Sequence, residues 1–419
     1  MSNNPAPSGK PILVIGGGIA GITAAVEAAE FGSEVILVEK EAYLGGRVVR
    51  MNQYFPKLCP PTCGLEINNQ RIRNNPRLKV HTLAEVVQVS GSRGDFHVTI
   101  KQNPRYVKGA VSRAHLDAVT SEVPDDFNYG QSTVKALHMP HDQAYPPLCV
   151  LHLDALTDAE KTALQAAEPK DVIDLSEEPR TFEVDIGAII LATGWRPYDA
   201  NNLDLLGYAE NADVITNVEM ERLASKGGPT SGKILRPSDG AEPTRVAFVQ
   251  CAGSRDTNHN LYCSAVCCMG SLKQARYVRA RLPDAQITIF YIDIRPIGRH
   301  EEFYYDLVKD DHVTFVKGKV ARVAANGSAL ALTAEDTIGG QLLQQDFDLV
   351  VLATGVVPNN VDSPIPGLKA ESDHYGFVVN PAERSGVYAV GCAVRPAEVS
   401  RSVKDATAAA LRAIQDVRR

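Results

Sequence analysis

Short runs of consecutive apolar residues alternate with Ala-rich or amphipathic stretches near the start of the chain. Residues 11–15 form one such run, residues 22–31 have the composition of a helix, and residues 34–39 form a second apolar run after Gly32. Strands that are buried on both faces of a parallel sheet read as continuous apolar runs. This part of the chain therefore predicts a strand, a helix and a second, parallel strand.

A second segment with the same alternation begins near residue 245. Residues 245–250 predict a buried strand, residues 262–281 predict a helix, and residues 286–291 and 313–316 predict further strands. Strands that alternate with helices in this way indicate an α/β fold with a parallel sheet.

The tetrapeptide Leu-Ala-Thr-Gly ends an apolar run at residues 191–194 and again at residues 352–355. We interpret this repetition as the mark of two related domains in tandem. The predicted fold class is therefore α/β with two Rossmann-like dinucleotide-binding domains. One domain is expected to comprise residues 1–200 and 356–419, and the other residues 205–355.

Three further segments complete the prediction. Residues 80–89 and 96–101, joined by a Gly-containing turn, predict a β-hairpin. Residues 387–390 predict a late strand, and residues 399–417 predict the last helix. Residues 103–180 are polar and rich in turn residues, so we expect an irregular insertion with little regular structure of its own.

Composition and charge narrow the class of protein. The chain has 419 residues, of which 44% are hydrophobic, and its formal net charge is 43 − 50 = −7. The apolar content excludes a globally disordered chain, and the mild acidity argues against a dedicated nucleic-acid-binding protein. No apolar run approaches the ~18–20 residues that span a bilayer. The polar start lacks the pattern of a signal peptide, so we expect a cytoplasmic protein without a membrane span.

Gly16, Gly18 and Gly21 form a Gly-x-Gly-x-x-Gly motif between the first predicted strand and the first predicted helix. In dinucleotide-binding folds the first glycine permits a tight turn, the second lets a pyrophosphate approach the backbone, and the third lets the helix pack on the strand. Glu39 ends the second predicted strand, where a carboxylate bonds a ribose hydroxyl and would repel a 2′-phosphate. The motif therefore predicts a dinucleotide site that disfavours NADP.

The doublet Gly45-Gly46 followed by Arg47 favours FAD over NAD. Together with the two Leu-Ala-Thr-Gly strands and Gly391, it resembles the flavoprotein disulfide reductases of thioredoxin reductase type. That family usually has Asp after the late glycine, where this sequence has Cys392. The last helix is expected to direct its positive N-terminal end toward the flavin. The FAD-binding residues expected on this basis are Gly16, Gly18, Ile19, Ala20, Gly21, Glu39, Lys40, Gly46, Arg47, Val86, Thr193, Gly194, Gly391 and Cys392.

Four of the eight cysteines lie in one short stretch after the strand predicted at 245–250. This stretch retains only Gly253 where a nicotinamide-binding turn would have several glycines, so we expect that ordinary NAD(P)H binding has been lost. Four thiolates are the ligand set of a [4Fe-4S] cluster, and a helix start would place the second and third of them on one face. Zinc, buried structural cysteines and His259 as a substitute ligand remain alternatives at this point. The proposed ligands are Cys251, Cys263, Cys267 and Cys268.

The spacing of these four cysteines resembles the A-type subunits of the heterodisulfide reductases. Residues 45–56, 122–127, 391–393 and 402–406 resemble the same family, so the similarity covers nearly the whole chain. Larger members carry inserted ferredoxin-like clusters, whereas residues 103–180 contain only Cys149. The chain is therefore more similar to the short heterodisulfide-reductase-like proteins of sulfur-oxidising bacteria.

This resemblance implies an electron-transfer protein with FAD and a [4Fe-4S] cluster in a cytoplasmic heterodisulfide-reductase-like complex. It also implies a homodimer with partners that resemble the B-type and C-type subunits of the heterodisulfide reductases.

Cys59 and Cys63 leave a second function open. They follow the glycine doublet and are either a redox-active pair near the flavin or reduced bystanders. A redox pair would suit a self-contained NAD(P)H-dependent disulfide reductase, and a scaffold with vestigial cofactors is a third possibility. We expect Cys149 and Cys392 to be packing residues, the latter close to FAD.

Overall fold

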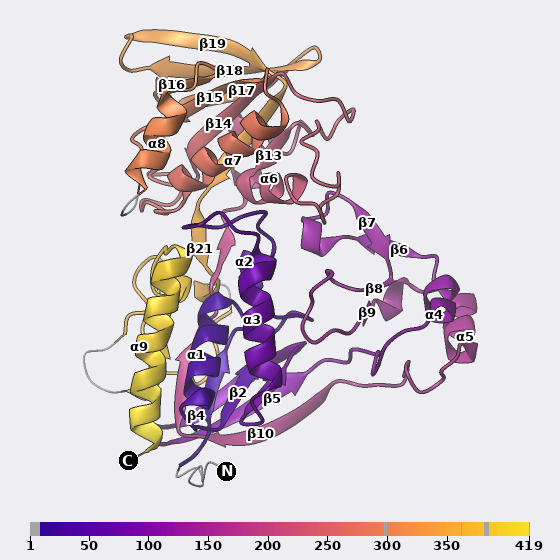
Figure 1. Cartoon of the computed structure of the whole chain (residues 1–419). Coiled ribbons are helices and arrows are strands. Elements are labelled where there is room, and N and C mark those ends of the chain that lie inside the picture. Colours follow the sequence, from indigo (N-terminus) through magenta and orange to yellow (C-terminus); the bar gives the residue numbers. More distant parts are fainter. Residues whose placement is uncertain (1–8, 297, 299, 362, 381–384, 419) are drawn as a thin grey trace. The chain divides into compact units, whose positions relative to one another are not determined.

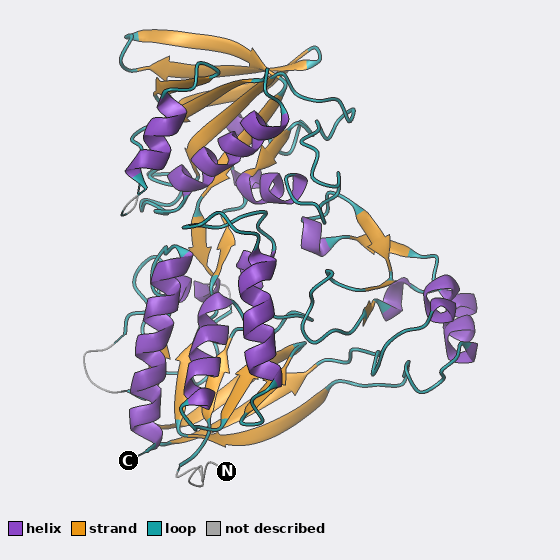
Figure 2. Cartoon of the chain, viewed as in Figure 1, coloured by secondary structure: helices purple, strands orange, loops and turns teal. Residues whose placement is uncertain are grey.

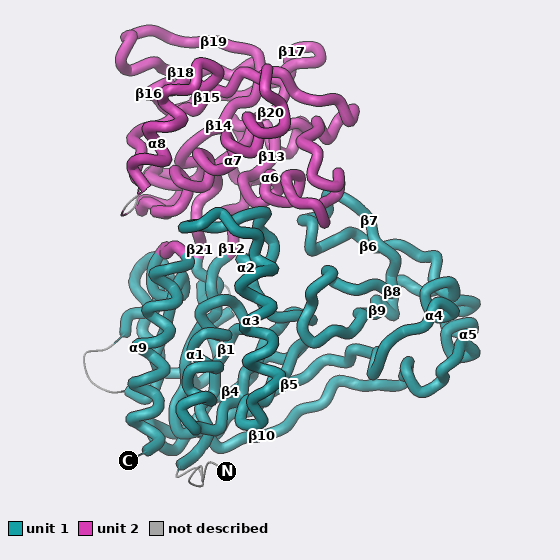
Figure 3. Tube along the Cα trace, in the orientation of Figure 1, with its two compact units in different colours: residues 1–195, 358–395, 399–419 teal, residues 196–357, 396–398 magenta. Residues whose placement is uncertain are grey.

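The computed structural model describes residues 9–296, 298, 300–361, 363–380 and 385–418. The chain divides into two compact units (Figure 3). Unit 1 comprises Met1–Trp195, Pro358–Arg395 and Val399–Arg419, and unit 2 comprises Arg196–Val357 and Pro396–Glu398. The predicted α/β class is confirmed, since each unit contains a five-stranded parallel sheet with helices packed on it (Figure 1).

The parallel sheet of unit 1 follows from the apolar runs of the sequence. Its strand order is β22-β11-β1-β2-β3, and every residue of its four apolar strands is buried. Because the strands run in parallel, their carboxyl ends meet at one edge, where Ile15 pairs with both Val38 and Leu191. The strands are β1 (Ile12–Ile15), β2 (Val35–Val38), β3 (Leu78–His81), β11 (Ala188–Leu191) and β22 (Val387–Ala389).

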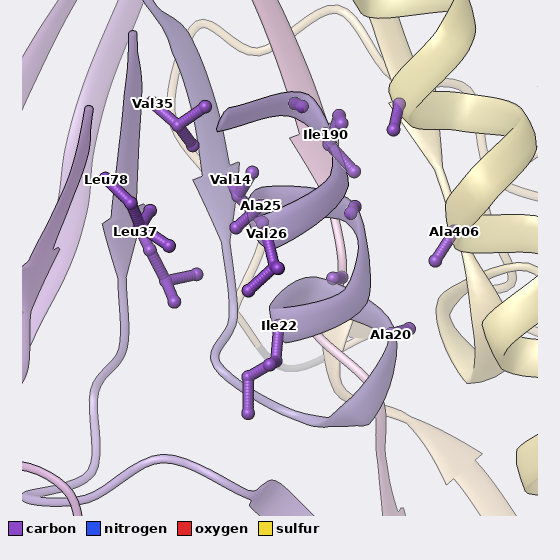
Figure 4. Packing of buried hydrophobic residues seen from close by; sticks show 14 of the residues in the cluster. Val14, Ala20, Ile22, Ala25, Val26, Val35, Leu37, Leu78, Ile190 and Ala406 are labelled. Carbon is purple, nitrogen blue, oxygen red and sulfur yellow. The ribbon is translucent and has the colours of Figure 1, made fainter. Parts of the chain in front are cut away.

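The two faces of this sheet pack against different layers. Ile12 and Val14 contribute to a core with the helices on one face, whereas Leu13 and Ile15 face an antiparallel sheet. Figure 2 shows the helices lying side by side over the strands, and Figure 4 shows the small residues that let them approach. The helices of unit 1 outside its insertion are α1 (Ile19–Glu30), α2 (Gly46–Val49), α3 (Pro61–Arg73) and α9 (Val399–Val417).

The antiparallel layer corrects the predicted hairpin. Residues 80–89 do not form one strand, because the extended conformation is interrupted at Leu83, which has a φ of 54°. The residues before this break complete the parallel sheet, and those after it form the hairpin. The antiparallel sheet has the order β10-β5-β4, with β4 (Ala84–Ser92), β5 (Asp95–Gln102) and β10 (Arg180–Ile186).

The insertion has more structure than the sequence suggested. Nine residues, Leu137 and Leu164 among them, form a buried hydrophobic cluster of its own. The carboxylate of Glu160, in the second helix of the insertion, accepts hydrogen bonds from the backbone and hydroxyl groups of Thr120 and Ser121. These two residues follow the first helix of the insertion, so the bonds link the two helices. Its elements are α4 (Arg113–Ala118), α5 (Asp158–Ala166), β6 (Glu122–Pro124), β7 (Thr133–Lys135), β8 (Leu137–His138), β9 (Val150–Leu151) and two 3-10 turns, η1 (Asp126–Asn128) and η2 (Leu153–Ala155).

Unit 2 repeats the plan of a parallel sheet with the order β13-β20-β14-β15-β16. One face packs on an antiparallel meander, and α7 packs on the central strands. The predicted helix at 262–281 begins only at Cys267. The elements are β13 (Val214–Thr216), β14 (Arg245–Ala252), β15 (Gln286–Tyr291), β16 (Val313–Lys317), β17 (Val320–Asn326), β18 (Ala329–Asp336), β19 (Gln341–Phe347), β20 (Leu349–Thr354), α6 (Asn217–Leu223), α7 (Cys267–Arg281) and α8 (Glu301–Val308).

Two short strands and four 3-10 turns complete the described elements. The strands β12 (Trp195–Pro197) and β21 (Val356–Pro358) pair with each other. The turns are η3 (Ala200–Asn202), η4 (Asp204–Leu206), η5 (Asn359–Val361) and η6 (Gly391–Ala393). Across the residues that the structure describes, no helix has both the length and the apolar content that crossing a bilayer requires.

The close contact between α1 and α9 gives a first prediction. Ala406 of α9 is fully buried, so Ala406→Leu adds volume to a filled core and is expected to lower the free energy of unfolding by about 1–3 kcal/mol. Ala408→Leu, on the exposed face of the same helix, is the matched control and should change it by less than about 0.5 kcal/mol. Urea titrations of both variants measure the difference, and equal stabilities would contradict this packing.

Candidate functional site

The glycine turn between β1 and α1 has the geometry that the motif predicts. Gly16 has a φ of +105°, and a Cβ on it would lie 2.3 Å from the carbonyl oxygen of Ala192. A Cβ on Gly21 would lie 1.8 Å from the carbonyl oxygen of Gly16. Both glycines are therefore required by the packing of backbone on backbone.

Gly18 differs from these two glycines, because the space beside it is open. A Cβ on Gly18 would meet no protein atom nearer than the Cα of Gly46, at 3.9 Å. The second glycine segment runs alongside, since the Gly45 amide donates to the carbonyl oxygen of Gly17 over 2.8 Å. The two glycine segments thus lie side by side, and no side chain covers the Cβ position of Gly18.

The first turn of α1 suits a negatively charged group. Gly18 is the residue before the helix, and no side chain caps the helix there. The first turn, which includes Ile19 and Ala20, contains no acidic residue. Uncapped backbone amides and the helix dipole at such a terminus favour an anion such as a pyrophosphate.

Glu39 follows β2 and lies beside the same glycine turn. Its carboxylate accepts hydrogen bonds from the amides of Gly17, at 2.5 Å, and Glu41, at 2.8 Å. Burial raises the pKa of Glu39 to about 6, and these two hydrogen bonds act in the opposite direction. A buried carboxylate at this strand end is the group that binds a ribose hydroxyl in dinucleotide-binding folds.

Arg47 is fixed by residues far away in the sequence. Its Nε donates to the carbonyl oxygen of Trp195 over 3.1 Å, and its Nη1 donates to the Tyr129 hydroxyl over 3.2 Å. The guanidinium also lies over both aromatic rings. Sequence reasoning identified Arg47 but missed Trp195 and Tyr129, for which no motif gave a signal.

Thr193 and Gly194, which are also expected to bind FAD, lie beside a pair of asparagines. The Asn359 side chain donates to the carbonyl oxygen of Thr193 over 2.7 Å, and the Thr193 hydroxyl donates to Asn360 Oδ1 over 2.6 Å. Gly194 follows with a φ of +69° and nothing within 4 Å of a Cβ position. The asparagines were also missed, because they contact Thr193 across more than 160 positions of sequence.

The remaining expected FAD residues are at different positions of unit 1. Lys40 is exposed, and Val86 is buried in β4. Gly391 has a φ of +60° and begins η6, and Cys392 is 9% exposed. These placements are compatible with the predicted list, whose members all belong to unit 1.

The cysteine cluster of unit 2 lies at the end of β14 and the start of α7. Cys251 has a φ of 59°, where the register of β14 shifts against β20. Cys263 lies in the loop before α7, with Ala265 at a φ of 58°, so the prediction that Cys263 and Cys267 share a helix face is wrong. Cys267 and Cys268 are the first two residues of α7.

The four thiols interact electrostatically with one another. Burial, followed by the neighbouring Cys268, raises the pKa of Cys251 to about 11. Burial also raises the pKa of Cys267, and each of the other three thiols adds to the increase. Three of the four thiols, those of Cys251, Cys267 and Cys268, are therefore buried, and binding a metal would stabilise their deprotonated form.

Contacts to sulfur and one unpaired amide define the surroundings of the four cysteines. Cys267 Sγ lies 3.6 Å from the carbonyl oxygen of Thr354, and the Ala265 amide donates to Cys263 Sγ over 3.4 Å. Gln250, next to Cys251, is 4% exposed, and both ends of its side-chain amide lack a hydrogen-bond partner. A buried amide without partners is unusual and fits a group with hydrogen-bonding capacity at this position.

A buried polar network supports the helix side of the cysteine cluster. The Thr354 hydroxyl donates to Asn217 Oδ1 over 2.9 Å, and Gln274 Nε2 donates to the Asn217 carbonyl oxygen over 2.7 Å. Gln274 also donates to Glu221, which forms a 3.0 Å ion pair with Lys273. The strand that ends at Thr354 and the helix that begins at Cys267 are thus fixed relative to each other.

The geometry bears on two alternatives for the four cysteines, namely His259 as a substitute ligand and a site for a single metal ion such as zinc. His259 Nδ1 is 2.8 Å from the Tyr198 hydroxyl. Among the residues of the described ranges, no three His, Cys, Asp or Glu side chains are grouped as a site for a single metal ion. The four cysteines are neighbours, but they are not arranged in this chain alone as a closed ion site.

Cys59 and Cys63 lie at the start of α3 in unit 1. Both are free thiols; Cys59 precedes the helix, and Cys63 is exposed in its first turn. The Tyr54 amide donates to the Cys59 carbonyl oxygen over 3.1 Å. Burial, followed by the nearby Cys59 and Cys63, raises the pKa of Tyr54.

Comparison with known proteins identifies related sequences. The family described as FAD dependent oxidoreductase matches residues 11–117. An iron-sulfur subunit of CoB-CoM heterodisulfide reductase from Methanopyrus kandleri, of the A type, is 37% identical over 96% of this chain and 63% of its own length. The A-type subunit of the ferredoxin:CoB-CoM heterodisulfide reductase from Methanosarcina mazei is 36% identical over 99% of this chain and 54% of its own length. The chain thus spans between about half and two thirds of the curated relatives that it matches.

Two solved thioredoxin reductases are among the structures with the same fold. The enzyme from T. acidophilum aligns with a TM-score of 0.55 and 14% identity, over 97% of this chain and 99% of its own. The enzyme from Lactococcus lactis aligns with a TM-score of 0.53 and 13% identity, over 97% and 98%. At these identities the likeness concerns the fold, and it confirms the predicted thioredoxin reductase type.

Glu39 makes the stability of flavin-free protein depend on pH. Its pKa is about 6 in the folded chain against an ordinary value of 4.5, so the folded state binds more protons between these values. Stability must therefore fall as pH rises through this window, by roughly 2 kcal/mol in all. In urea titrations from pH 4 to 8, Glu39→Gln should remove this part of the decline, whereas Glu66→Gln, on the exposed face of α3, should keep it. Parallel pH profiles for the wild type and Glu39→Gln would disprove the assignment.

Proposed function

This chain is a relative of the A-type subunits of the heterodisulfide reductases over nearly its whole length, and we propose that it is an FAD-dependent electron-transfer subunit of such a complex. In this proposal unit 1 binds FAD, and unit 2 carries a [4Fe-4S] cluster on its four neighbouring cysteines. When bound, FAD exchanges one or two electrons, and a cluster of this kind exchanges one.

The residues of unit 1 fit FAD. The uncapped first turn of α1 would hold the pyrophosphate, and the open space beside Gly18 would admit it to the backbone. Glu39 would accept a ribose hydroxyl in a buried position, and it would exclude a 2′-phosphate by its charge. Arg47, fixed by Trp195 and Tyr129, would add a positive charge next to the second glycine segment.

The convergence of four cysteines is the observation that carries the cluster assignment. Cys251 lies at the end of β14, where a second dinucleotide-binding domain would bind its nucleotide, and Cys263, Cys267 and Cys268 precede or begin α7. All three other thiols contribute to the raised pKa of Cys267. Gly253, the remaining glycine there, packs on Tyr198, because a Cβ on it would lie 2.3 Å from that ring. These residues supply thiolate ligands and no bare backbone for a phosphate.

We further propose the assembly and pathway in which this chain works. The names of the relatives describe subunits of multi-subunit enzymes, which supports partners similar to the B-type and C-type subunits, and we infer a homodimer in the cytoplasm. In residues 103–180 the only cysteine is Cys149, which is buried in the insertion's own hydrophobic cluster. The insertion thus supplies no set of cluster ligands, which supports a role in sulfur oxidation.

A self-contained NAD(P)H-dependent disulfide reductase is the less favoured function. It would need a nucleotide site in unit 2, where cysteines replace the glycine-rich turn. Cys59 and Cys63 have no assigned role in the proposed function.

Flavin binding can be tested at the second glycine of the motif. Gly18→Ala places a methyl group in space where the nearest protein atom is 3.9 Å away, so we expect a folded protein whose FAD affinity falls at least about tenfold, or about 1.4 kcal/mol. The FAD-to-protein absorbance ratio and a thermal melt of the flavin-free protein measure the two effects.

Gly109→Ala, in the insertion, is the control, because a Cβ there makes only an ordinary 3.7 Å contact. Full FAD occupancy in Gly18→Ala would show that the site has been misplaced.

The metal ligands can be tested by Cys267→Ser. Protein purified without oxygen should contain about four iron and four acid-labile sulfide per chain, and the variant should lose them while it retains FAD. Cys149→Ser is the control, since that thiol is similarly buried but belongs to the insertion. Unchanged iron in Cys267→Ser would refute the ligand set, and iron-free wild-type protein would refute the cluster.

A further inference from the structure

Three charged side chains of unit 2 gather beside the four cysteines. Arg255 follows β14, and Asp293 and Arg295 follow β15. These strands are neighbours in the parallel sheet, so the segments after them begin at the same edge. Arg295 Nε and Nη2 both donate to Asp293 Oδ2 over 3.0 Å, and Arg255 Nη1 donates to Oδ1 of the same carboxylate.

Two of these residues are close to a proposed ligand. Arg255 lies four residues after Cys251, where β14 ends. The carbonyl oxygen of Asp293 lies 3.6 Å from Cys268 Sγ. Asp293 thus holds two guanidinium groups with its carboxylate, and its carbonyl oxygen contacts the sulfur atom of one of the four cysteines.

The charges in this arrangement act on any cluster that the cysteines bind. Hydrogen bonds to sulfur, net charge and solvent exposure set the reduction potential of an iron–sulfur cluster. An added electron is stabilised by nearby positive charge, most strongly where water is excluded. The Arg255 side chain is 23% exposed and that of Arg295 is 47% exposed, so Arg255 should have the larger effect.

We propose that Arg255 and Arg295 raise the reduction potential of the cluster by their positive charge, and that Asp293 is the positioning residue that holds both arginines beside it. This inference rests on the proposed function, because it requires a cluster on these cysteines. It adds that residues other than the four proposed ligands tune the reduction potential of the cluster.

Redox titrations of the iron-loaded, full-length protein, followed by EPR, test this inference. Arg255→Gln should lower the equilibrium constant for one-electron reduction of the cluster about tenfold, which corresponds to ~59 mV. Arg295→Gln should lower it less, and Arg255→Lys, which keeps the positive charge, should restore part of the loss. The flavin potential should remain unchanged in all variants.

Asp293→Asn separates a positioning role from a simple charge effect. If Asp293 acted only through its own negative charge, removing that charge would raise the cluster potential. If Asp293 holds the arginines beside the cysteine cluster, as we propose, the potential falls. A rise in Asp293→Asn therefore overturns the positioning role.

An ion pair of similar exposure provides the control. Arg279 and Asp310 form a 2.8 Å pair in unit 2 with side chains 20% and 26% exposed, and no contact to a cysteine is described for either. Arg279→Gln and Asp310→Asn should leave the cluster potential unchanged.

The outcomes distinguish this inference from the proposed function. Iron-loaded Arg255→Gln and Arg295→Gln with wild-type cluster potentials would overturn the inference alone. Wild-type protein without iron would overturn the proposed function and this inference with it. If one arginine variant fails to retain iron, the other arginine and Asp293→Asn still decide the question.

Discussion

Backbone contacts between Gly16, Gly21 and Ala192 allow α1 to lie directly against the sheet of unit 1. A Cβ at position 21 would come within 1.8 Å of the Gly16 carbonyl oxygen, so no side chain is tolerated where helix and turn cross. This contact fixes the direction of α1 and therefore the place where its unpaired amides meet the strand ends. The open space at Gly18 and the buried carboxylate of Glu39 are positioned to bind a dinucleotide only because α1 is fixed in this way.

Unit 2 uses the same sheet plan for different chemistry. Its central strand β14 does not continue into a turn of bare backbone, because Cys251 adopts a left-handed conformation and Gly253 packs on Tyr198. The adjacent strand end at Thr354 is joined to α7 through Asn217 and Gln274. The parallel sheet thus provides a fixed edge in both units, and the residues placed at that edge differ.

The sequence predicted those features that depend on local pattern. Continuous apolar runs predicted most strands of both parallel sheets, although not β13 and not β3 as a separate strand, and the helix predicted at residues 399–417 matches α9. The hairpin was misread because Leu83, a residue with no turn signal, adopts a positive φ. The start of α7 was misread for a similar reason at Ala265.

Features that depend on distant contacts were not predicted. The hydrophobic cluster of the insertion joins short segments that are each too polar to predict a strand or helix. Arg255 and Asp293 are 38 positions apart and meet only because β14 and β15 are paired. The same limit applies to Asn359 and Asn360, which contact Thr193 across the whole length of unit 2.

The order of strands in unit 1 has a consequence for biosynthesis. Strand β11 pairs with β22, yet nearly all of unit 2 lies between them in the chain. At about 5–20 residues per second, a ribosome needs about 10–40 s to make the intervening segment. During this time Ile189 and Ile190 lack their β22 partners on one edge of the sheet. Almost all of unit 2, in contrast, is one continuous segment of the chain that is synthesised in the same interval. Unit 2 can therefore fold before the parallel sheet of unit 1 is complete.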